Sequence, residues 1–309
     1  MRILVTGGAG FIGSHAVERL AADGHHLLVV DDLSSGRLEN LPAATAIEVT
    51  TVAAAAAGGL VERFRPAVIV HLAAQVDARR SVEEPLADAQ VNLLDTLALL
   101  AAARRAGTRR FVFASSAAVY GDAARMPTPE EEPTRPISPY GAAKRAVELY
   151  LAALAGDGGP GWAALRFANV YGPRQGAAGE AGVVAVFGRL LAAGAAPHIH
   201  GDGGQTRDYV YVGDVAEAIA RALAAAASGV WNVSTGVETT VNALFARLAE
   251  RLSPGARARH AAPRAGDPRR SALSFARIER ELGWRPRTSL AEGLDATAAW
   301  FRAGEGTTS

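Results

Sequence analysis

The sequence predicts a doubly wound α/β fold built on a parallel sheet, and two observations support this prediction. Short apolar segments typical of buried parallel strands recur along the first half of the chain, at 2–6, 26–30, 67–71, 110–114 and 162–167. Helical patterns separate them, at 11–23, 52–65, 86–106 and 138–155. Right-handed crossovers would bring all the strand carboxyl ends to one edge of the sheet, where ligands bind in such folds.

The first thirty residues form a strand, a glycine-rich turn, a helix and a second strand. Gly7 permits the tight turn, Gly10 lets the backbone approach a pyrophosphate, and Gly13 lets helix and strand pack closely. The N–H groups at the helix start then face the phosphates. Asp31 ends the second strand, where a carboxylate accepts from both ribose hydroxyls and repels a 2′-phosphate. These features predict a Rossmann-type domain that binds NAD rather than NADP.

The second half of the chain has a different pattern. Glycine and proline become frequent over 172–204, and the alternation of strands and helices lapses. We expect residues 1–167, with roughly 208–236, to form the NAD-binding domain. Residues 168–207 and 237–309 would form a smaller α+β substrate domain with a frayed tail from 303.

Composition excludes several classes of function. The net charge of +1 offers no footprint for nucleic acid or a membrane surface. The absence of cysteine rules out disulfides, thiolate nucleophiles and cysteine–zinc sites, and no metal site is predicted. The N-terminus lacks a signal-peptide pattern, and no apolar run approaches the roughly 20 residues of a membrane span. We therefore expect a cytoplasmic enzyme.

One candidate for acid–base chemistry lies on the helix that Ser138 and Pro139 begin. Of the 32 basic residues only Lys144 is lysine, and it follows Tyr140 by four positions, on the same helix face. The strand at 110–114 delivers Ser115 and Ser116 to the same sheet edge. Tyrosine ionises near 10 in water, and an adjacent ammonium and an oxidised nicotinamide both favour its phenolate. Such a base can remove a proton from a sugar hydroxyl while hydride leaves the same carbon.

With these residues in view, the chain resembles the UDP-glucose 4-epimerase family of the extended short-chain dehydrogenase/reductases. The resemblance covers nearly the whole chain. It rests on Thr6–Gly13, Val30–Ser34, His71–Gln75, Ser115–Gly121, Tyr140–Lys144, Arg166–Pro173, Arg207–Tyr209, Arg264–Asp267 and Leu282–Trp284.

The resemblance implies an activity and its catalytic residues. Tyr140 would be the base, Ser116 its hydrogen-bonding partner, and Lys144 the residue that binds the nicotinamide ribose and lowers the tyrosine pKa. The reaction would be 4-epimerisation of a UDP-hexose (UDP-glucose/UDP-galactose). Hydride would pass from C4 to tightly held NAD and return to the other face of a transient 4-keto sugar.

The resemblance also implies the binding residues. The cofactor contacts would be Gly7, Gly10, Phe11, Ile12, Gly13, Asp31, Asp32, Leu33, Ser34, Leu72, Ala73, Ala74, Gln75, Asn92, Ala114, Tyr140, Lys144 and Phe167. The substrate contacts would be Arg79, Ser116, Tyr140, Asn169, Arg207, Arg264 and Asp267. Asn169 would contact the phosphates, the two arginines Arg207 and Arg264 would flank the diphosphate, and Asp267 would accept from the uridine ribose. His71 is expected to pack at its strand end and not to bind a ligand.

Two departures from the family pattern matter. Thr50 and Thr51 stand where family members usually carry an acid that contacts adenine, which predicts weaker NAD binding. Ala117 and Ala118 replace the Asp–Glu pair of the related 4,6-dehydratases, so dehydration is poorly supported. The glutamate that UDP-glucuronate decarboxylases use nearby is also missing.

The identity of the sugar stays open at this point. Arg79 and Arg80 lie on the ligand edge and could pair with a C6 carboxylate, which makes a UDP-glucuronate/UDP-galacturonate 4-epimerase the alternative. In contrast, 179–184 looks more like the neutral-hexose epimerases. Another nucleotide-sugar oxidoreductase or dehydratase, or a non-catalytic NAD-sensing protein, is less well supported. The apolar surfaces of the helices 86–106 and 138–155 predict a homodimer through a four-helix interface.

Overall fold

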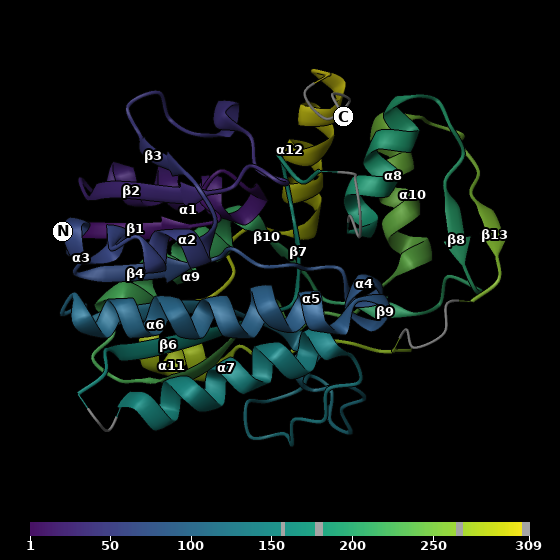
Figure 1. The fold of residues 1–309 in the computed structure, drawn as a ribbon. Helices are drawn as coiled ribbons and strands as arrows, with labels where there is room; N and C mark the ends of the chain where they lie inside the picture. The colour runs from purple at the N-terminus through teal and green to yellow at the C-terminus, as the bar shows by residue number, and fades with distance from the viewer. Residues whose placement is uncertain (156–157, 177–181, 264–267, 305–309) are drawn as a thin grey trace.

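The centre of the molecule is a seven-stranded sheet in which every neighbouring pair is parallel (Figure 1). The computed structural model describes residues 1–155, 158–176, 182–263 and 268–304. The strand order is β11 (Gly229–Val233), β6 (Gly161–Phe167), β5 (Arg110–Ser116), β4 (Val68–His71), β1 (Arg2–Thr6), β2 (His26–Asp31) and β3 (Ala46–Val49). The order reverses between β1 and β4, so a ligand crevice is expected at the carboxyl ends of these two strands. The predicted Rossmann-type fold is confirmed.

Helices cover both faces of the sheet, which explains why its strands are apolar without alternation. Successive strand residues point to opposite faces, and here both faces are buried. Val5 and Val29 belong to one core, and Leu4 and Leu28 belong to the other. The first core is closed by α1 (Phe11–Ala22), α9 (Val212–Ala224) and α11 (Ala276–Leu282). The second is closed by α2 (Val52–Ala57), α3 (Leu60–Phe64), α6 (Asp95–Arg105) and α7 (Pro139–Ala155).

Three predicted segments differ in detail from the structure. The predicted loop over 33–47 contains the 3-10 turn η1 (Leu38–Asn40) and reaches into β3. The predicted helix 52–65 is broken, because Gly59 adopts a left-handed conformation (φ +69°) between α2 and α3. The helix expected over 86–106 is continuous but not uniform. It consists of α5 (Pro85–Ala89), a π-helical segment η2 (Gln90–Leu94) and α6.

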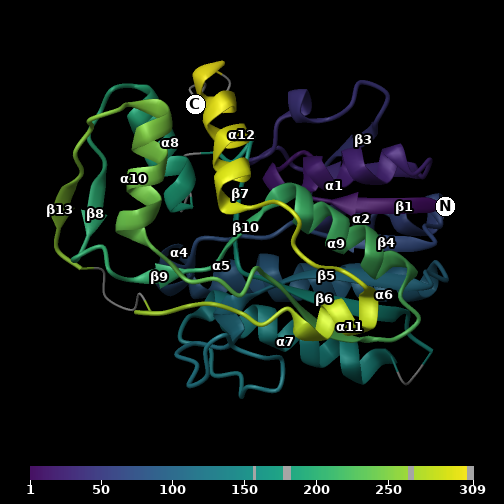
Figure 2. The same cartoon turned by 180° about the vertical axis from the view of Figure 1, so that it is seen from behind.

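A separate group of elements lies at the far end of the molecule from the N-terminus, as Figures 1 and 2 both show. Here α8 (Val183–Ala192), α10 (Val241–Leu252) and α12 (Leu290–Arg302) share a third hydrophobic core. Three two-stranded sheets accompany this group among the described residues. They pair β7 (Asn169–Tyr171) with β10 (Tyr209–Tyr211), β9 (Thr206–Arg207) with β12 (Thr239–Thr240), and β8 (His198–His200) with β13 (Arg259–Ala261). The β8–β13 sheet lies at the outer edge of the group (Figure 1). Two short helical elements, α4 (Ala78–Glu83) and η3 (Ala117–Val119), border the sheet edge.

By length and composition alone, the stretch Pro85–Arg105 is long and apolar enough to cross a membrane, contrary to the prediction from the sequence. Asp88, Asn92 and Thr96 are nevertheless buried against protein in this stretch, and Leu99 and Leu100 lie in the core beneath the sheet. One face of the stretch therefore packs against the protein, while Leu86, Val91 and Leu94 are exposed.

Candidate functional site

The glycine-rich turn forms the centre of the sheet edge. Gly7 has a φ of +69°, and a Cβ at this position would lie 2.6 Å from the backbone nitrogen of Ala73. A Cβ on Gly13 would lie 1.9 Å from the carbonyl oxygen of Gly7, so only glycine allows α1 to pack this closely. Gly10 is the N-cap of α1, and no side chain caps this helix. The first N–H groups of α1 thus remain available for an anion.

Asp31 is held rigidly at the end of β2. Its side-chain oxygens accept hydrogen bonds from the backbone N–H groups of Ala9 and Leu33, both at 2.9 Å. A Cβ on Gly36 would lie 2.8 Å from Asp31 Oδ1, which is a constraint that the sequence analysis missed. The neighbouring Asp32 is exposed, and its carboxylate accepts from Ser34 of its own loop. The free helix N–H groups can donate to phosphates, and the one fixed carboxylate can accept from ribose hydroxyls. Together they fit a dinucleotide without a 2′-phosphate.

The end of β4 is supported by a neutral histidine. His71 is buried, and its ring nitrogens contact the hydroxyl oxygens of Thr6 at 2.6 Å and Thr96 at 2.9 Å. Burial, with the positive charge of Lys144 second, lowers the pKa of His71 to about 3. The histidine therefore has the packing role expected of it. It fixes the start of the segment Leu72–Gln75, which borders the glycine turn.

A buried polar network continues from this segment into the helical stretch 85–105. Asn92 accepts from the backbone N–H of Gln75 at 3.1 Å and donates to its carbonyl oxygen at 2.9 Å. Asp88 Oδ1 accepts from Asn92 Nδ2 at 2.8 Å and from Gln75 Nε2 at 3.0 Å. Asn92 lies in the π-helical segment, a type of distortion that is frequent at functional sites. The network places Asn92 behind the candidate cofactor edge.

Tyr140 and Lys144 lie on the first turns of α7, which begins at the same edge. Ser138 Oγ accepts from the backbone N–H of Gly141 at 3.2 Å, as expected for a helix cap, and Ser81 Oγ accepts from that of Tyr140. The Lys144 ammonium lies 5.8 Å from the centre of the Tyr140 ring and 4.7 Å from that of Phe113. Burial lowers the pKa of Lys144 to about 8, and the Asp88 carboxylate acts in the opposite direction. The lysine is still mostly an ammonium at pH 7.

Ser116 ends β5 directly beside the start of α7. Its Oγ accepts from the backbone N–H of Ala118 at 3.2 Å. A Cβ on Gly141 would lie 2.6 Å from the carbonyl oxygen of Ala118, so α7 packs closely against η3, which directly follows the strand. In the sheet register Ser116 is opposite Phe167, which brings the predicted residues Ala114 and Phe167 to the same edge. Ser116 thus ends its strand next to η3, which packs on the helix start that carries Tyr140 and Lys144, and the joint catalytic role of the three residues stays a prediction.

A second buried network, missed from the sequence, joins α7 to the strands beneath the site. Glu148 accepts from Ser115 Oγ at 2.6 Å and is paired with Arg166 at 2.7 Å and 2.9 Å. Both partners of the ion pair are almost fully buried. Glu148 follows Lys144 by four residues, as Lys144 follows Tyr140, and this spacing was a signal that could have revealed it.

The adenine side of the edge carries the two threonines noted in the sequence. The backbone N–H of Thr50 donates to the carbonyl oxygen of Asp31 at 3.0 Å, which holds the segment against β2. Thr51 is the N-cap of α2, and its hydroxyl accepts from Ala54 N at 3.2 Å. Thr51 therefore has a structural role in starting a helix.

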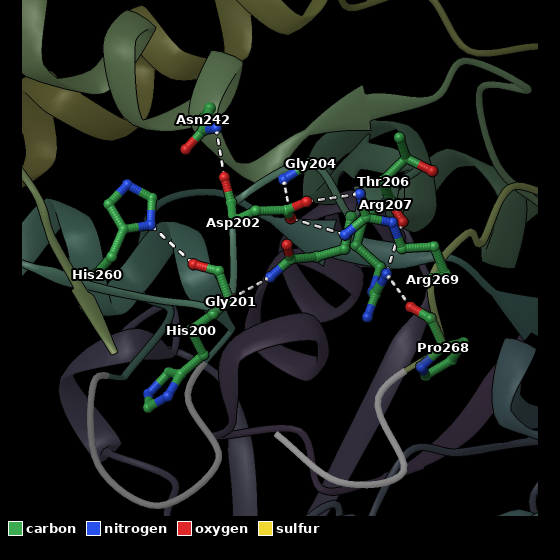
Figure 3. A network of polar contacts seen from close by, with 11 residues as sticks. His200, Gly201, Asp202, Gly204, Thr206, Arg207, Asn242, His260, Pro268 and Arg269 are labelled. Carbon is green, nitrogen blue, oxygen red and sulfur yellow. Dashed lines mark hydrogen bonds and ion pairs between the residues drawn. The ribbon is translucent and has the colours of Figure 1, made fainter. Parts of the chain in front are cut away.

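The candidate substrate residues lie where the sheet meets the third core. Asn169 begins β7, is exposed, and donates its backbone N–H to the carbonyl oxygen of Asp208, directly after Arg207. Arg207 Nη1 donates to the carbonyl oxygens of Thr206 at 2.6 Å and Pro268 at 2.8 Å (Figure 3). These contacts hold the guanidinium against the carbonyl oxygens of its own strand and of Pro268.

Other candidate residues are separate from this group or lie outside the described residues. Arg79 is exposed on α4, where its backbone N–H donates to the Asp77 carboxylate, and its neighbour Arg80 is paired with Glu84 at 3.0 Å. Arg264, Asp267 and residues 179–181 of the segment 179–184 fall in the stretches that the structure does not describe. Figure 3 shows the surface network that follows, in which Arg269 is paired with Asp202.

Comparison with known proteins gives consistent results. Residues 3–234 match the family model described as the NAD dependent epimerase/dehydratase family. A UDP-glucose 4-epimerase of Mycolicibacterium smegmatis is 46% identical over 309 residues, covering 98% of this chain and 99% of the relative. The UDP-glucose 4-epimerase of Thermotoga maritima, solved with UDP-glucose, is similar with a TM-score of 0.94 and 43% identity, covering 99% of this chain and 100% of that one. The Thermus thermophilus UDP-glucose 4-epimerase in complex with NAD has a TM-score of 0.91 and 43% identity, covering 98% and 99%.

Proposed function

Because this chain belongs to the NAD-dependent epimerase/dehydratase family, we propose that it is a UDP-hexose 4-epimerase that interconverts UDP-glucose and UDP-galactose. The observation that carries this proposal is the buried Lys144 ammonium beside Tyr140, at the edge where the glycine turn would place a dinucleotide. Near full-length similarity to UDP-glucose 4-epimerases supports the choice of sugar.

The proposed cofactor site follows from the residues at the sheet edge. The first N–H groups of α1 would hold the diphosphate, and Asp31 would accept from the adenine ribose. Asn92 would keep Gln75 in place at the nicotinamide side. When bound, NAD supplies a reversible acceptor for the hydride on C4 of the sugar.

The proposed acid–base step belongs to Tyr140. Its phenolate would take the proton from O4 of the sugar as the C4 hydride departs, and would return a proton when hydride returns to the other face. The Lys144 ammonium favours the phenolate by its positive charge. Ser116, at the end of β5, would hydrogen-bond the same sugar oxygen.

We propose that cofactor binding and nucleotide-sugar binding are carried out by different segments of the chain. The segments 1–167 and roughly 208–236 would hold NAD, and 168–207 with 237–309 would hold the nucleotide part of the substrate. Asn169 and Arg207 would contact the diphosphate, and Arg264 and Asp267 remain candidates for the same role. The separate third core supports this division, although α11 packs back on the sheet.

Removing one hydroxyl tests the proposal. Tyr140→Phe should lower the turnover of UDP-glucose by about 10³-fold, because the base is lost, and should leave NAD bound. Tyr150→Phe, on the exposed side of the same helix, is the matched control and should keep full activity. Wild-type turnover by Tyr140→Phe would contradict the proposal.

Assaying UDP-glucose and UDP-glucuronate side by side separates the candidate reactions. Turnover confined to UDP-glucuronate would favour the uronate reaction, with Arg79 the candidate partner of the C6 carboxylate. Accumulation of reduced cofactor would indicate a net oxidoreductase. If neither substrate is turned over, the result would favour the non-catalytic NAD-sensing alternative.

We also propose a homodimer through α6 and α7. The outer faces of these helices border an apolar hollow lined by Leu97, Leu100, Ala101, Tyr150, Leu151 and Leu154. Tyr150, which lines this hollow, is 47% exposed, and its neighbour Leu149 on α7 is 54% exposed. Exposed apolar faces of this kind mark interaction sites. We expect the wild type to sediment as a dimer and Leu149→Glu to sediment as a monomer. A wild type that sediments as a monomer at micromolar concentration would refute the interface.

A further inference from the structure

Lys144, the one lysine of the chain, is buried with no neutralising partner in direct contact among the residues that the structure describes. Lys144 is 2% exposed, and it forms no ion pair with any described residue. An isolated ammonium in a low-dielectric site is unfavourable, and such groups lose their proton unless a carboxylate is near. The proposed role of Lys144 needs the charged form, so the site requires a source of negative charge.

Asp88 is a buried carboxylate on a neighbouring helix, and its negative charge acts on Lys144 to raise the pKa of the lysine. It lies on α5, which packs against α7, and it is 2% exposed. Its Oδ1 is fixed by Asn92 and Gln75, and its Oδ2 has no hydrogen-bond partner among the described residues. One side of the carboxylate is therefore anchored, while the other retains its full capacity to interact with a positive charge.

The other groups around Lys144 cannot take this role. Glu148, one turn further along α7, is a buried carboxylate that is already paired with Arg145 and Arg166. His71, from β4, is neutral and held between two threonines. Phe113, from β5, offers only its ring, and Asn92, from the π-helical segment, is uncharged. Tyr140, from α7 itself, is the group that the ammonium has to act on.

We propose that Asp88 is a positioning residue whose carboxylate keeps Lys144 in its ammonium form, and so maintains the charge that favours the Tyr140 phenolate. This inference rests on the proposed function for its purpose. Its test reads the charge of Lys144 directly, so failure of the inference and failure of the proposed function are distinguishable.

The chain offers an unusually direct measurement, because it contains one lysine. Protein labelled with ¹³Cε-lysine and loaded with NAD should give a single Cε resonance whose pH titration reports Lys144 alone. Asp88→Asn keeps an oxygen to accept from Asn92 and Gln75 but removes the negative charge. We expect the titration midpoint to fall by about one pH unit in this variant. An unchanged midpoint would overturn the proposal and leave Asp88 only its hydrogen bonds to Asn92 and Gln75.

Asp95→Asn is the matched control, because Asp95 lies in the same helical stretch but is paired with Gln90 at 2.7 Å. Its midpoint should equal that of the wild type.

A second measurement does not depend on titration. In a double-mutant cycle of Asp88→Asn and Lys144→Met, the unfolding free energies should show a favourable coupling of about 1.4 kcal/mol, which corresponds to one pH unit. Absence of coupling would equally overturn the proposal.

Discussion

The nicotinamide end and the adenine end of the sheet edge are built in different ways. Around Tyr140 and Lys144, side chains from five elements form buried polar networks, in which Glu148 and Asp88 are almost fully enclosed. Around Asp31, backbone N–H groups and glycines define the shape, and the flanking side chains Asp32 and Ser34 reach solvent. The acid–base step at the nicotinamide end requires charged side chains at fixed positions away from water. Recognition of adenosine requires mainly a backbone surface of complementary shape.

The largest effect is expected where a charge network at the nicotinamide end is broken. Glu148→Gln leaves the Arg166 guanidinium buried without its ion-pair partner. The free energy of unfolding should fall by about 3 kcal/mol, as found for other buried pairs that lose one member. Chemical denaturation measures this. The exposed Glu18, paired with Arg174, provides a control whose change to Gln should alter stability little, and equal losses in both variants would contradict the comparison.

The buried histidine predicts how stability depends on pH. The pKa of His71 is about 3 in the folded protein, below the ordinary value of 6.5 in the unfolded chain, so the unfolded chain binds the proton first. Stability is therefore lost as the pH falls from 6.5 towards 3, by up to about 1.4 kcal/mol per pH unit. Denaturation between pH 7 and pH 5 should show a loss of about 2 kcal/mol from this group. His71→Gln should flatten this dependence, and an unchanged slope would contradict the assignment.

Two serines provide a matched test of burial. Ser115 Oγ and Ser34 Oγ each donate to a carboxylate at 2.6 Å, the first in the buried network and the second on the exposed loop. Ser115→Ala should reduce the free energy of unfolding by about 1.5 kcal/mol, because it removes a hydrogen bond to a buried charge. Ser34→Ala should change it by less than about 0.5 kcal/mol. Equal losses would show that the two ends do not differ in the way described.

The smallest effect concerns cofactor affinity at the adenine end. Thr50→Asp supplies the acid that family members usually carry in this neighbourhood and should tighten NAD binding by about tenfold, equal to about 1.4 kcal/mol. Thr51→Asp is the control, because this side chain caps α2 and a carboxylate can cap equally well. Calorimetry on the cofactor-free protein measures both. Weaker binding by Thr50→Asp would show that the threonine already makes a better contact.

The difference between the two ends also explains what sequence alone could predict. The glycine turn, Asp31 and the Tyr140–Lys144 pair are local in sequence and were placed correctly at one sheet edge. The apolar segments predicted most of the strands in the sheet, and the Ser138 cap predicted the start of α7. Strand β3 was missed because it has four residues, none of them buried.

The supporting networks could not be derived in the same way. Glu148 and Arg166 are 18 residues apart, and only the register of β6 beside β5 brings them together. Asp88 is a single carboxylate in an apolar helix, and nothing local shows that it faces inward. Its direction depends on the π-helical segment that follows it.

That segment, η2, has a geometric consequence of its own. An α-helix turns by about 100° per residue, and a π-helical turn accommodates an additional residue. η2 therefore sets the rotational phase of α5 relative to α6, so that Asp88 and Asn92 face the ligand edge while Leu99 and Leu100 face the core. Deleting one residue from η2 would rotate α5 away from that phase without changing any side chain in it. Substitutions preserve chain length, so they leave the rotational phase of α5 relative to α6 unchanged. Only insertions and deletions in η2 can test the importance of this phase.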